Sequence, residues 1–141
     1  MKINLYPYFQ LLRIGDARGY FLISFFGFFL VKGFLAPIEN ILIFLGMVFF
    51  LFSFSFSIND CFDEKEDKLD KTKKNPIVLK KVSFKKALFF SFSLAVLGLI
   101  FSSFLGLKVF LFYLLIISLF LFYTAPPLRL KSRFPLDIIT H

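Results

Sequence analysis

The sequence contains a single cysteine, Cys61, and therefore cannot form a disulfide within the chain. Acidic residues are also scarce: nine Asp and Glu stand against 17 Lys and Arg, which gives a formal net charge of +8. In a soluble domain such an excess would suggest a nucleic-acid partner. Here the basic residues lie between long apolar runs. The charge therefore favours anionic lipid headgroups or phosphorylated substrates as partners, and no nucleic acid.

Apolar side chains are abundant. They make up 58% of the 141 residues, 25 of which are Phe, and the mean hydropathy is +0.80. A soluble domain of this length has a high surface-to-volume ratio and cannot hide so much apolar surface. A lipid bilayer removes that difficulty, so the composition predicts an integral membrane protein.

Four apolar runs, at about 19–37, 38–58, 87–107 and 109–125, predict an all-α, multi-pass transmembrane bundle that forms part of one domain over residues 1–141. The second run has 21 residues, which span roughly 31 Å as a helix and match a hydrocarbon core. Pro126 and Pro127 should end the fourth helix, because neither can donate to a helical ladder. Residues 1–18 fit either an interfacial helix or a solvated tail.

The basic residues indicate how the bundle is oriented. With four spans and both ends on one side, that side carries 15 of the 17 basic residues, and only Lys32 and Lys108 lie elsewhere. The positive-inside rule then predicts that both termini and the charged loop 59–86 are cytoplasmic. The 15 are Lys2, Arg13, Arg18, the nine Lys between Lys65 and Lys86, Arg129, Lys131 and Arg133.

Six of the nine acidic residues lie between Asp60 and Asp70. If the second helix continues past residue 58, Asp60, Asp63 and Asp67 fall within about 60° of one another around its axis, flanked by Asn59 and Asp70. Like charges on one face repel, which favours a bound cation. Magnesium fits best, because it takes oxygen ligands and is commonly held by one or two carboxylates plus substrate phosphates. The alternative is a solvated loop of mixed charge; an EF-hand is disfavoured because its alternating ligands and central Gly are missing.

The run Asn59-Asp60-x-x-Asp63-x-x-x-Asp67, placed directly after an apolar span, resembles the first aspartate-rich motif of the UbiA superfamily of intramembrane prenyltransferases. Other stretches are similar to family segments in the same order along the chain. They are Leu12-Arg13 before the first span, Asn75-Pro76-Ile77 with Val82-Ser83 and Ala87-Leu88 before the third, and Tyr123-Thr124-Ala125-Pro126-Pro127-Leu128-Arg129-Leu130-Lys131 after the fourth.

The resemblance implies magnesium-dependent transfer of an isoprenyl group from an isoprenyl diphosphate to a lipophilic or aromatic acceptor within the membrane. Magnesium would neutralise the departing diphosphate. By the same resemblance Asn59, Asp60, Asp63 and Asp67 would hold the metal, the three aspartates being the catalytic carboxylates. Arg129 and Lys131 would contact the diphosphate and Tyr123 would line the pocket; ordinary interfacial anchoring is the alternative for these three.

Two departures from the family pattern concern substrate geometry and completeness. Asn75 stands where the family commonly has Arg before the Pro, and no Gly occurs in 78–82. The family's second aspartate-rich motif is missing, because the other acidic residues, Asp16, Glu39 and Asp137, form no group. We therefore expect the N-terminal half of a fold of about nine spans, as a fragment, a split gene product or a subunit that needs a C-terminal half or second subunit, and an isolated chain without activity. Residues 136–141 should begin another apolar segment.

Two other functions compete with prenyl transfer. A non-catalytic membrane protein would use the acidic loop to bind cations or a partner. A transporter segment is disfavoured, because Lys32 is the one ionisable residue well inside a span, whereas transport pathways usually place several there.

Overall fold

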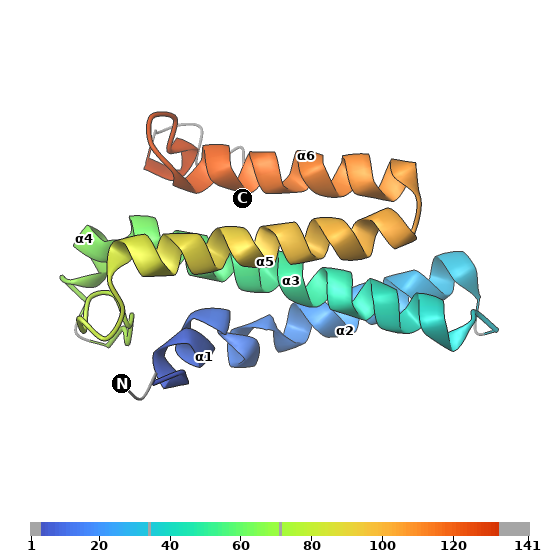
Figure 1. Cartoon of the computed structure of the whole chain (residues 1–141), viewed down its shortest axis with the longest axis horizontal. Helices are drawn as coiled ribbons and strands as arrows, with labels where there is room; N and C mark the ends of the chain where they lie inside the picture. Colours follow the sequence, from blue (N-terminus) through green and yellow to red (C-terminus); the bar gives the residue numbers. More distant parts are fainter. Residues whose placement is uncertain (1–3, 34, 71, 133–141) are drawn as a thin grey trace.

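A computed structural model describes residues 4–33, 35–70 and 72–132. Every regular element among these residues is helical, which confirms the predicted all-α class (Figure 1). The elements are α1 (Tyr6–Leu12), α2 (Ile14–Lys32), α3 (Ile38–Phe62), α4 (Glu64–Asp67), α5 (Phe84–Phe104), α6 (Leu107–Thr124) and the short 3-10 helix η1 (Leu130–Ser132).

Four helical segments are long and apolar enough to cross a membrane: Tyr6–Lys32, Ile38–Phe62, Phe84–Phe104 and Leu107–Thr124. They correspond to the four predicted runs and make the chain an integral membrane protein. The helices extend beyond the hydropathy limits on the polar side: α3 continues four residues past Ile58, and α5 begins three residues before Ala87. The charged residue in the extra turn of α3, Asp60, has a cationic partner at the end of the bundle, as described below.

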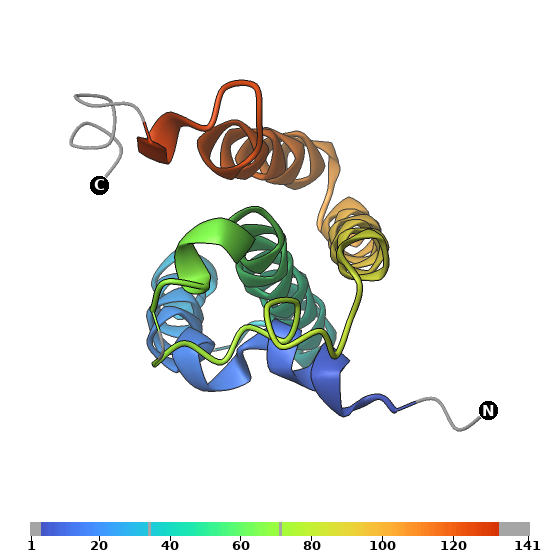
Figure 2. The same cartoon turned by 90° about the vertical axis from the view of Figure 1, so that its left-hand side faces the viewer.

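The residues that precede the first predicted apolar run, described from residue 4 to residue 18, are mostly helical. Pro7 lies in the first turn of α1, where its missing amide hydrogen costs nothing. Arg13 then adopts the left-handed conformation, with φ 46°, and separates α1 from α2. The break turns α1 across the end of α3 (Figure 2).

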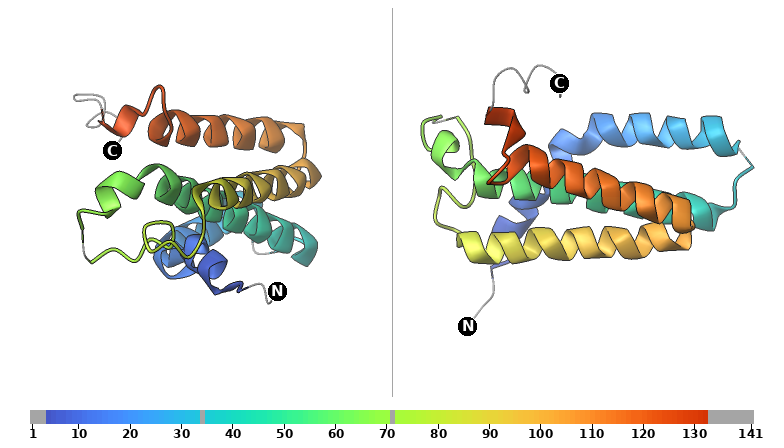
Figure 3. Two further views of the ribbon diagram at one scale, coloured as in Figure 1. Left: turned by 60° about the vertical axis from the view of Figure 1, so that its left-hand side comes forward. Right: turned by 90° about the horizontal axis from the view of Figure 1, so that it is seen from above.

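Helix α3 is the centre of the bundle and lies between α2 and the antiparallel pair α5–α6 (Figure 3). Small buried side chains recur every four residues on α3 and again on α5, and the Ser57 and Ser91 hydroxyl oxygens are 2.6 Å apart. Such residues let helix backbones approach closely in a bilayer. They are Ser53, Ser57 and Cys61 on α3, and Ala87, Ser91 and Ala95 on α5.

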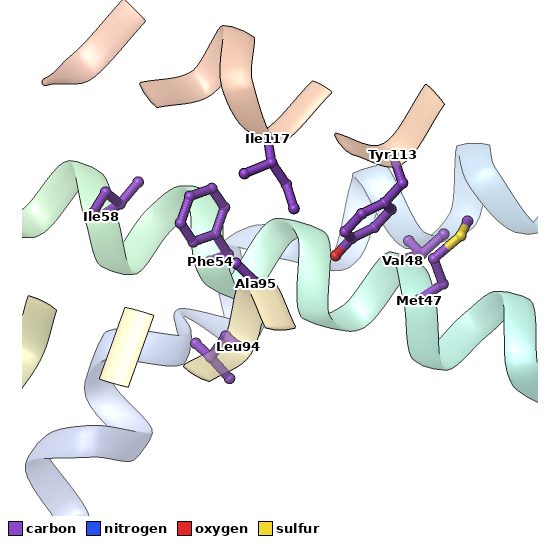
Figure 4. Close-up of a cluster of buried hydrophobic side chains, with 8 residues drawn as sticks. All are labelled: Met47, Val48, Phe54, Ile58, Leu94, Ala95, Tyr113 and Ile117. Atoms are coloured by element: carbon purple, nitrogen blue, oxygen red, sulfur yellow. The ribbon is translucent and has the colours of Figure 1, made fainter. Parts of the chain in front are cut away.

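The main core joins α3, α5 and α6 (Figure 4). Tyr113 of α6 is its largest fully buried side chain, and a Cβ at Gly98 of α5 would collide with the Tyr113 hydroxyl. A larger residue at position 98 would therefore require the Tyr113 side chain to move. The core consists of Met47, Val48, Phe54, Ile58, Leu94, Ala95, Tyr113 and Ile117.

The packing brings the chemically interesting segments to one end of the bundle. The end of α3, the start of α5, the end of α6 and helix α1 all lie there (Figure 1), and Figure 2 looks onto this end. Among the residues used in the sequence predictions, Lys2, Lys71, Arg133, Asp137 and the stretch 136–141 lie outside the described residues.

Candidate functional site

The acidic motif occupies the last turn of α3 and the short helix α4. Helix α3 ends at Phe62, and α4 resumes at Glu64. Two backbone hydrogen bonds bridge the break: Asp63 N donates to Asn59 O at 2.9 Å, and Asp67 N donates to Asp63 O at 2.8 Å. The helical spacing assumed from the sequence is therefore largely kept, with a break at Asp63.

Asn59 and Asp63 face the segment that follows α6. Lys131 Nζ lies 2.5 Å from both Asn59 Oδ1 and Asp63 Oδ1, and Thr124 Oγ1 donates to Asn59 Oδ1 at 2.8 Å. The side chains of Asp63 and Lys131 are each only 13% exposed. We call this part of the end the η1 side.

Arg129 also joins the segment after α6 to the end of α3. Its Nη2 donates to Phe62 O at 3.2 Å, to Asp63 Oδ1 at 3.2 Å and to Glu66 Oε1 at 2.7 Å. The pKa of Glu66 is lowered, first by a hydrogen bond from its own backbone amide and then by Arg129. The Arg129 guanidinium thus binds the segment after α6 to the end of α3 and to α4.

Asp60 and Asp67 are bound from the direction of α1 and of the loop before α5, and we call this part the α1 side. Asp60 is 5% exposed, and Arg13 Nη1 lies 3.3 Å from its Oδ1. Arg13 also pairs with Asp16 at 2.6 Å. The weak sequence match at Leu12-Arg13 thus marks a residue of the site.

Asp67 is 4% exposed and has both carboxylate oxygens occupied. Lys73 Nζ donates to its Oδ1 at 2.8 Å, and Asn75 Nδ2 donates to its Oδ2 at 3.0 Å. The hydrogen bond to Asp67 raises the pKa of Lys73. The sequence marks Asn75 only as a departure from the family pattern; nothing in the local sequence signals its contact with Asp67.

A cavity of about 430 Å³ opens on the α1 side. Its wall mixes carboxylates with cationic and amide groups, and the charges of its three acidic and three basic residues balance. The lining residues are Gln10, Arg13, Asp16, Asp60, Asp67, Thr72, Lys73, Lys74 and Asn75.

The four predicted metal ligands are therefore shared between two sides: Asn59 and Asp63 on the η1 side, Asp60 and Asp67 on the α1 side. Within residues 4–33, 35–70 and 72–132, no three His, Cys, Asp or Glu side chains gather closely enough to hold a metal. The donors present are all oxygen atoms, as a hard cation requires. They fit a magnesium ion that takes one or two carboxylates and completes its shell with phosphates, and not an all-protein cage.

Three predicted residues lie at or after the end of α6. Arg129 and Lys131 reach the motif, as described above. Tyr123 is half-buried in the last turn of α6, and its role in lining a pocket remains a prediction.

Comparisons with known proteins agree with the resemblance drawn from the motifs. The chain is 33% identical over 103 residues to a digeranylgeranylglyceryl phosphate synthase of Methanococcus maripaludis, covering 72% of this chain and 37% of that protein. The synthase of a second strain is 32% identical over the same length. The chain thus spans little more than a third of the length of these relatives. No solved structure matches. The profile of the UbiA prenyltransferase family matches residues 20–140, and the chain belongs to that family.

Proposed function

We propose that this chain supplies the part of an intramembrane prenyltransferase that holds the magnesium-bound diphosphate of an isoprenyl diphosphate. The observation that carries the proposal is the meeting of Asn59, Asp63 and Lys131 on the η1 side. Two oxygen donors and one flexible ammonium, largely shielded from water, suit a metal and a phosphate held side by side.

We assign the metal to Asn59 and Asp63, since their side-chain oxygens share one partner and therefore lie close together. Asp60 and Asp67, the other two predicted ligands, lie on the α1 side. We propose that they stabilise this end of the bundle through their ion pairs with Arg13 and Lys73. When bound, the magnesium ion would neutralise the departing diphosphate and ease ionisation of the allylic carbon–oxygen bond.

Lys131 and Arg129 supply the positive charge for the diphosphate. Lys131 contacts the oxygens that the metal would take, so binding requires its ammonium to turn from Asp63 toward phosphate; its long stem permits this. Arg129 is held by three oxygens and keeps the segment after α6 in place while Lys131 turns.

The acceptor is proposed from the relatives. They are named for synthesis of digeranylgeranylglyceryl phosphate, which favours a glyceryl phosphate lipid over an aromatic ring as acceptor for this chain. We expect transfer itself to require a C-terminal half or second subunit, because the chain covers 37% of those relatives.

The end of the bundle that carries the acidic motif also carries most of the basic residues, which supports a cytoplasmic location for this end. Labelling of a Thr72→Cys variant from either side of the membrane would test that location.

Magnesium dependence of diphosphate binding tests the proposal. The chain is reconstituted in nanodiscs, and the affinity for radiolabelled geranylgeranyl diphosphate is measured with and without magnesium. We expect magnesium to tighten binding at least tenfold in the wild type and not in Asp63→Asn. Asp70→Asn is the matched control, because Asp70 is exposed and its carboxylate accepts hydrogen bonds from Thr72, away from the η1 side.

The competing function is a non-catalytic membrane protein that binds cations or a partner through its acidic residues. It draws support from the pairing of Asp60, Asp63 and Asp67, each with a cationic side chain. Under that function Asp63→Asn leaves diphosphate affinity unchanged with and without magnesium, which is the result that would overturn the proposal.

A further inference from the structure

Asn75 is a polar residue buried as deeply as the carboxylates of the site, with 4% of its surface exposed. Its Nδ2 donates to Asp60 O at 2.8 Å and to Asp67 Oδ2 at 3.0 Å, while its Oδ1 accepts from Ile77 N at 2.9 Å. Both donor hydrogens and the acceptor are therefore engaged inside the protein. No part of this amide remains to contact a phosphate.

We propose that Asn75 and Asp67 form a clasp that positions the last turn of α3, and that Asn75 is a positioning residue for the metal–diphosphate site. The inference rests on the proposed function for its consequence, but the clasp itself is defined by the contacts above. It joins three separate pieces of chain: the end of α3 through Asp60 O, helix α4 through Asp67, and the loop before α5 through Asn75 and Ile77.

The clasp controls the η1 side through the backbone. Asp67 N donates to Asp63 O, and Asp63 N donates to Asn59 O. A shift of Asp67 is therefore transmitted along this ladder to the two residues assigned to the metal. The clasp also occupies the second oxygen of Asp67, so this carboxylate acts as an anchor for the loop.

The loop is fastened at the same point by apolar packing. Leu79 N donates to Asn75 O at 3.1 Å and Lys81 N to Pro76 O at 2.9 Å. Ile77 and Val82 belong to a buried cluster with Leu11, Cys61 and Ala87. These contacts hold residues 75–82 against the end of α3, and the clasp adds hydrogen bonds to this apolar packing.

The hydrogen bonds of the clasp require a neutral amide side chain at position 75. An Asp at position 75 would place a second carboxylate within about 3 Å of Asp67, and like charges at that distance do not both ionise. A Leu would leave Asp60 O and Asp67 Oδ2 without their donor and the Ile77 amide without its acceptor, so the substitution removes three contacts of buried groups at once. Lys73 supplies the compensating charge separately.

Exchanging the two partners provides the test. We compare Asn75→Asp, Asp67→Asn and the double variant that carries both changes, in nanodiscs, with the exposed Asn40→Asp as control. Hydrogen exchange of residues 77–82 reports the clasp, and magnesium-dependent diphosphate affinity reports the site. Asn75→Asp should speed exchange at least tenfold and weaken the affinity at least fivefold. Asp67→Asn should do less, because its amide oxygen still accepts from Asn75.

The double variant distinguishes a specific hydrogen bond from a merely structural role. The new amide at position 67 can then donate to the new carboxylate at position 75, while Asp60 O stays without its donor. Exchange and affinity should therefore both recover in part, by at least about threefold relative to Asn75→Asp. If Asn75→Asp does not fold, recovery of folded protein in the double variant is itself the rescue.

Each other outcome counts against a separate part of the inference. Absence of rescue overturns the clasp. Faster exchange with unchanged affinity overturns the positioning role and leaves the proposed function standing. If the wild type binds no diphosphate, the proposed function fails, and the exchange data alone decide for or against the clasp.

Discussion

Replacement of Lys131 by Met should change the affinities for a bare metal ion and for a metal–diphosphate complex in opposite directions. The ammonium of Lys131 lies against Asn59 Oδ1 and Asp63 Oδ1, the oxygens assigned to the metal. A bare divalent ion must therefore displace it, whereas a metal–diphosphate complex offers it a phosphate in exchange. Lys131→Met should tighten binding of the bare ion and weaken binding of the complex.

The size of the first effect follows from the charges. After displacement the ammonium remains about 5 Å from the ion, where two unit charges repel by about 3 kcal/mol at an effective dielectric constant of about 20. An ion of higher charge increases this value, while movement of the flexible lysine stem reduces it. Since about 1.4 kcal/mol is a factor of ten, we expect bare-ion affinity to rise roughly tenfold to hundredfold.

The assay is a titration with Mn²⁺ followed by electron paramagnetic resonance, which counts free ions, first alone and then with geranylgeranyl diphosphate. Lys68→Met is the matched control, because Lys68 pairs with Glu64 at 2.7 Å, away from the η1 side. An unchanged affinity for Mn²⁺ in Lys131→Met would rule out this role of Lys131. So would a change in the same direction for the ion and for the complex.

Two further predictions concern stability and are measured by chemical unfolding in detergent followed by circular dichroism. Gly98→Ala should lower the unfolding free energy by about 1–3 kcal/mol through overpacking, because its Cβ meets the Tyr113 hydroxyl. Gly27→Ala is the control and should leave the unfolding free energy unchanged, because a Cβ there meets nothing within 4 Å. Equal stability of the two variants would contradict the packing described. Arg129→Met should cost about 2 kcal/mol, since it removes hydrogen bonds to Asp63 and to a backbone oxygen, whereas Arg18→Met, which loses one exposed contact to a backbone oxygen, should cost under about 0.5 kcal/mol. A loss in Arg18→Met as large as that in Arg129→Met would refute the closing role of Arg129.

The sequence predicts the helices well because long apolar runs have one stable form in a bilayer. It does not predict where α3 ends, because its last turn is stabilised by groups distant in sequence. Arg13 is 47 residues from Asp60, and Lys131 is 72 residues from Asn59. Helical periodicity cannot place such partners.

The same limit explains the division of the acidic motif. Spacing around a helix axis puts Asp60, Asp63 and Asp67 on one face. The partners approach that face from two directions, however, with Arg13 on one side and Lys131 on the other. Asn75 could be read from the sequence only as an exception to a family pattern, since its role depends on a loop that folds back onto α3.

The position of a metal ion in an experimental structure tests the proposed site on the η1 side. Crystals grown with Mn²⁺ and an isoprenyl diphosphate would be measured at the manganese absorption edge. A metal held on the η1 side gives an anomalous peak between Asn59 and Asp63, with the Lys131 ammonium turned toward the diphosphate. A peak confined to Asp60 and Asp67, or a diphosphate bound with no metal at Asp63, would contradict the proposed site.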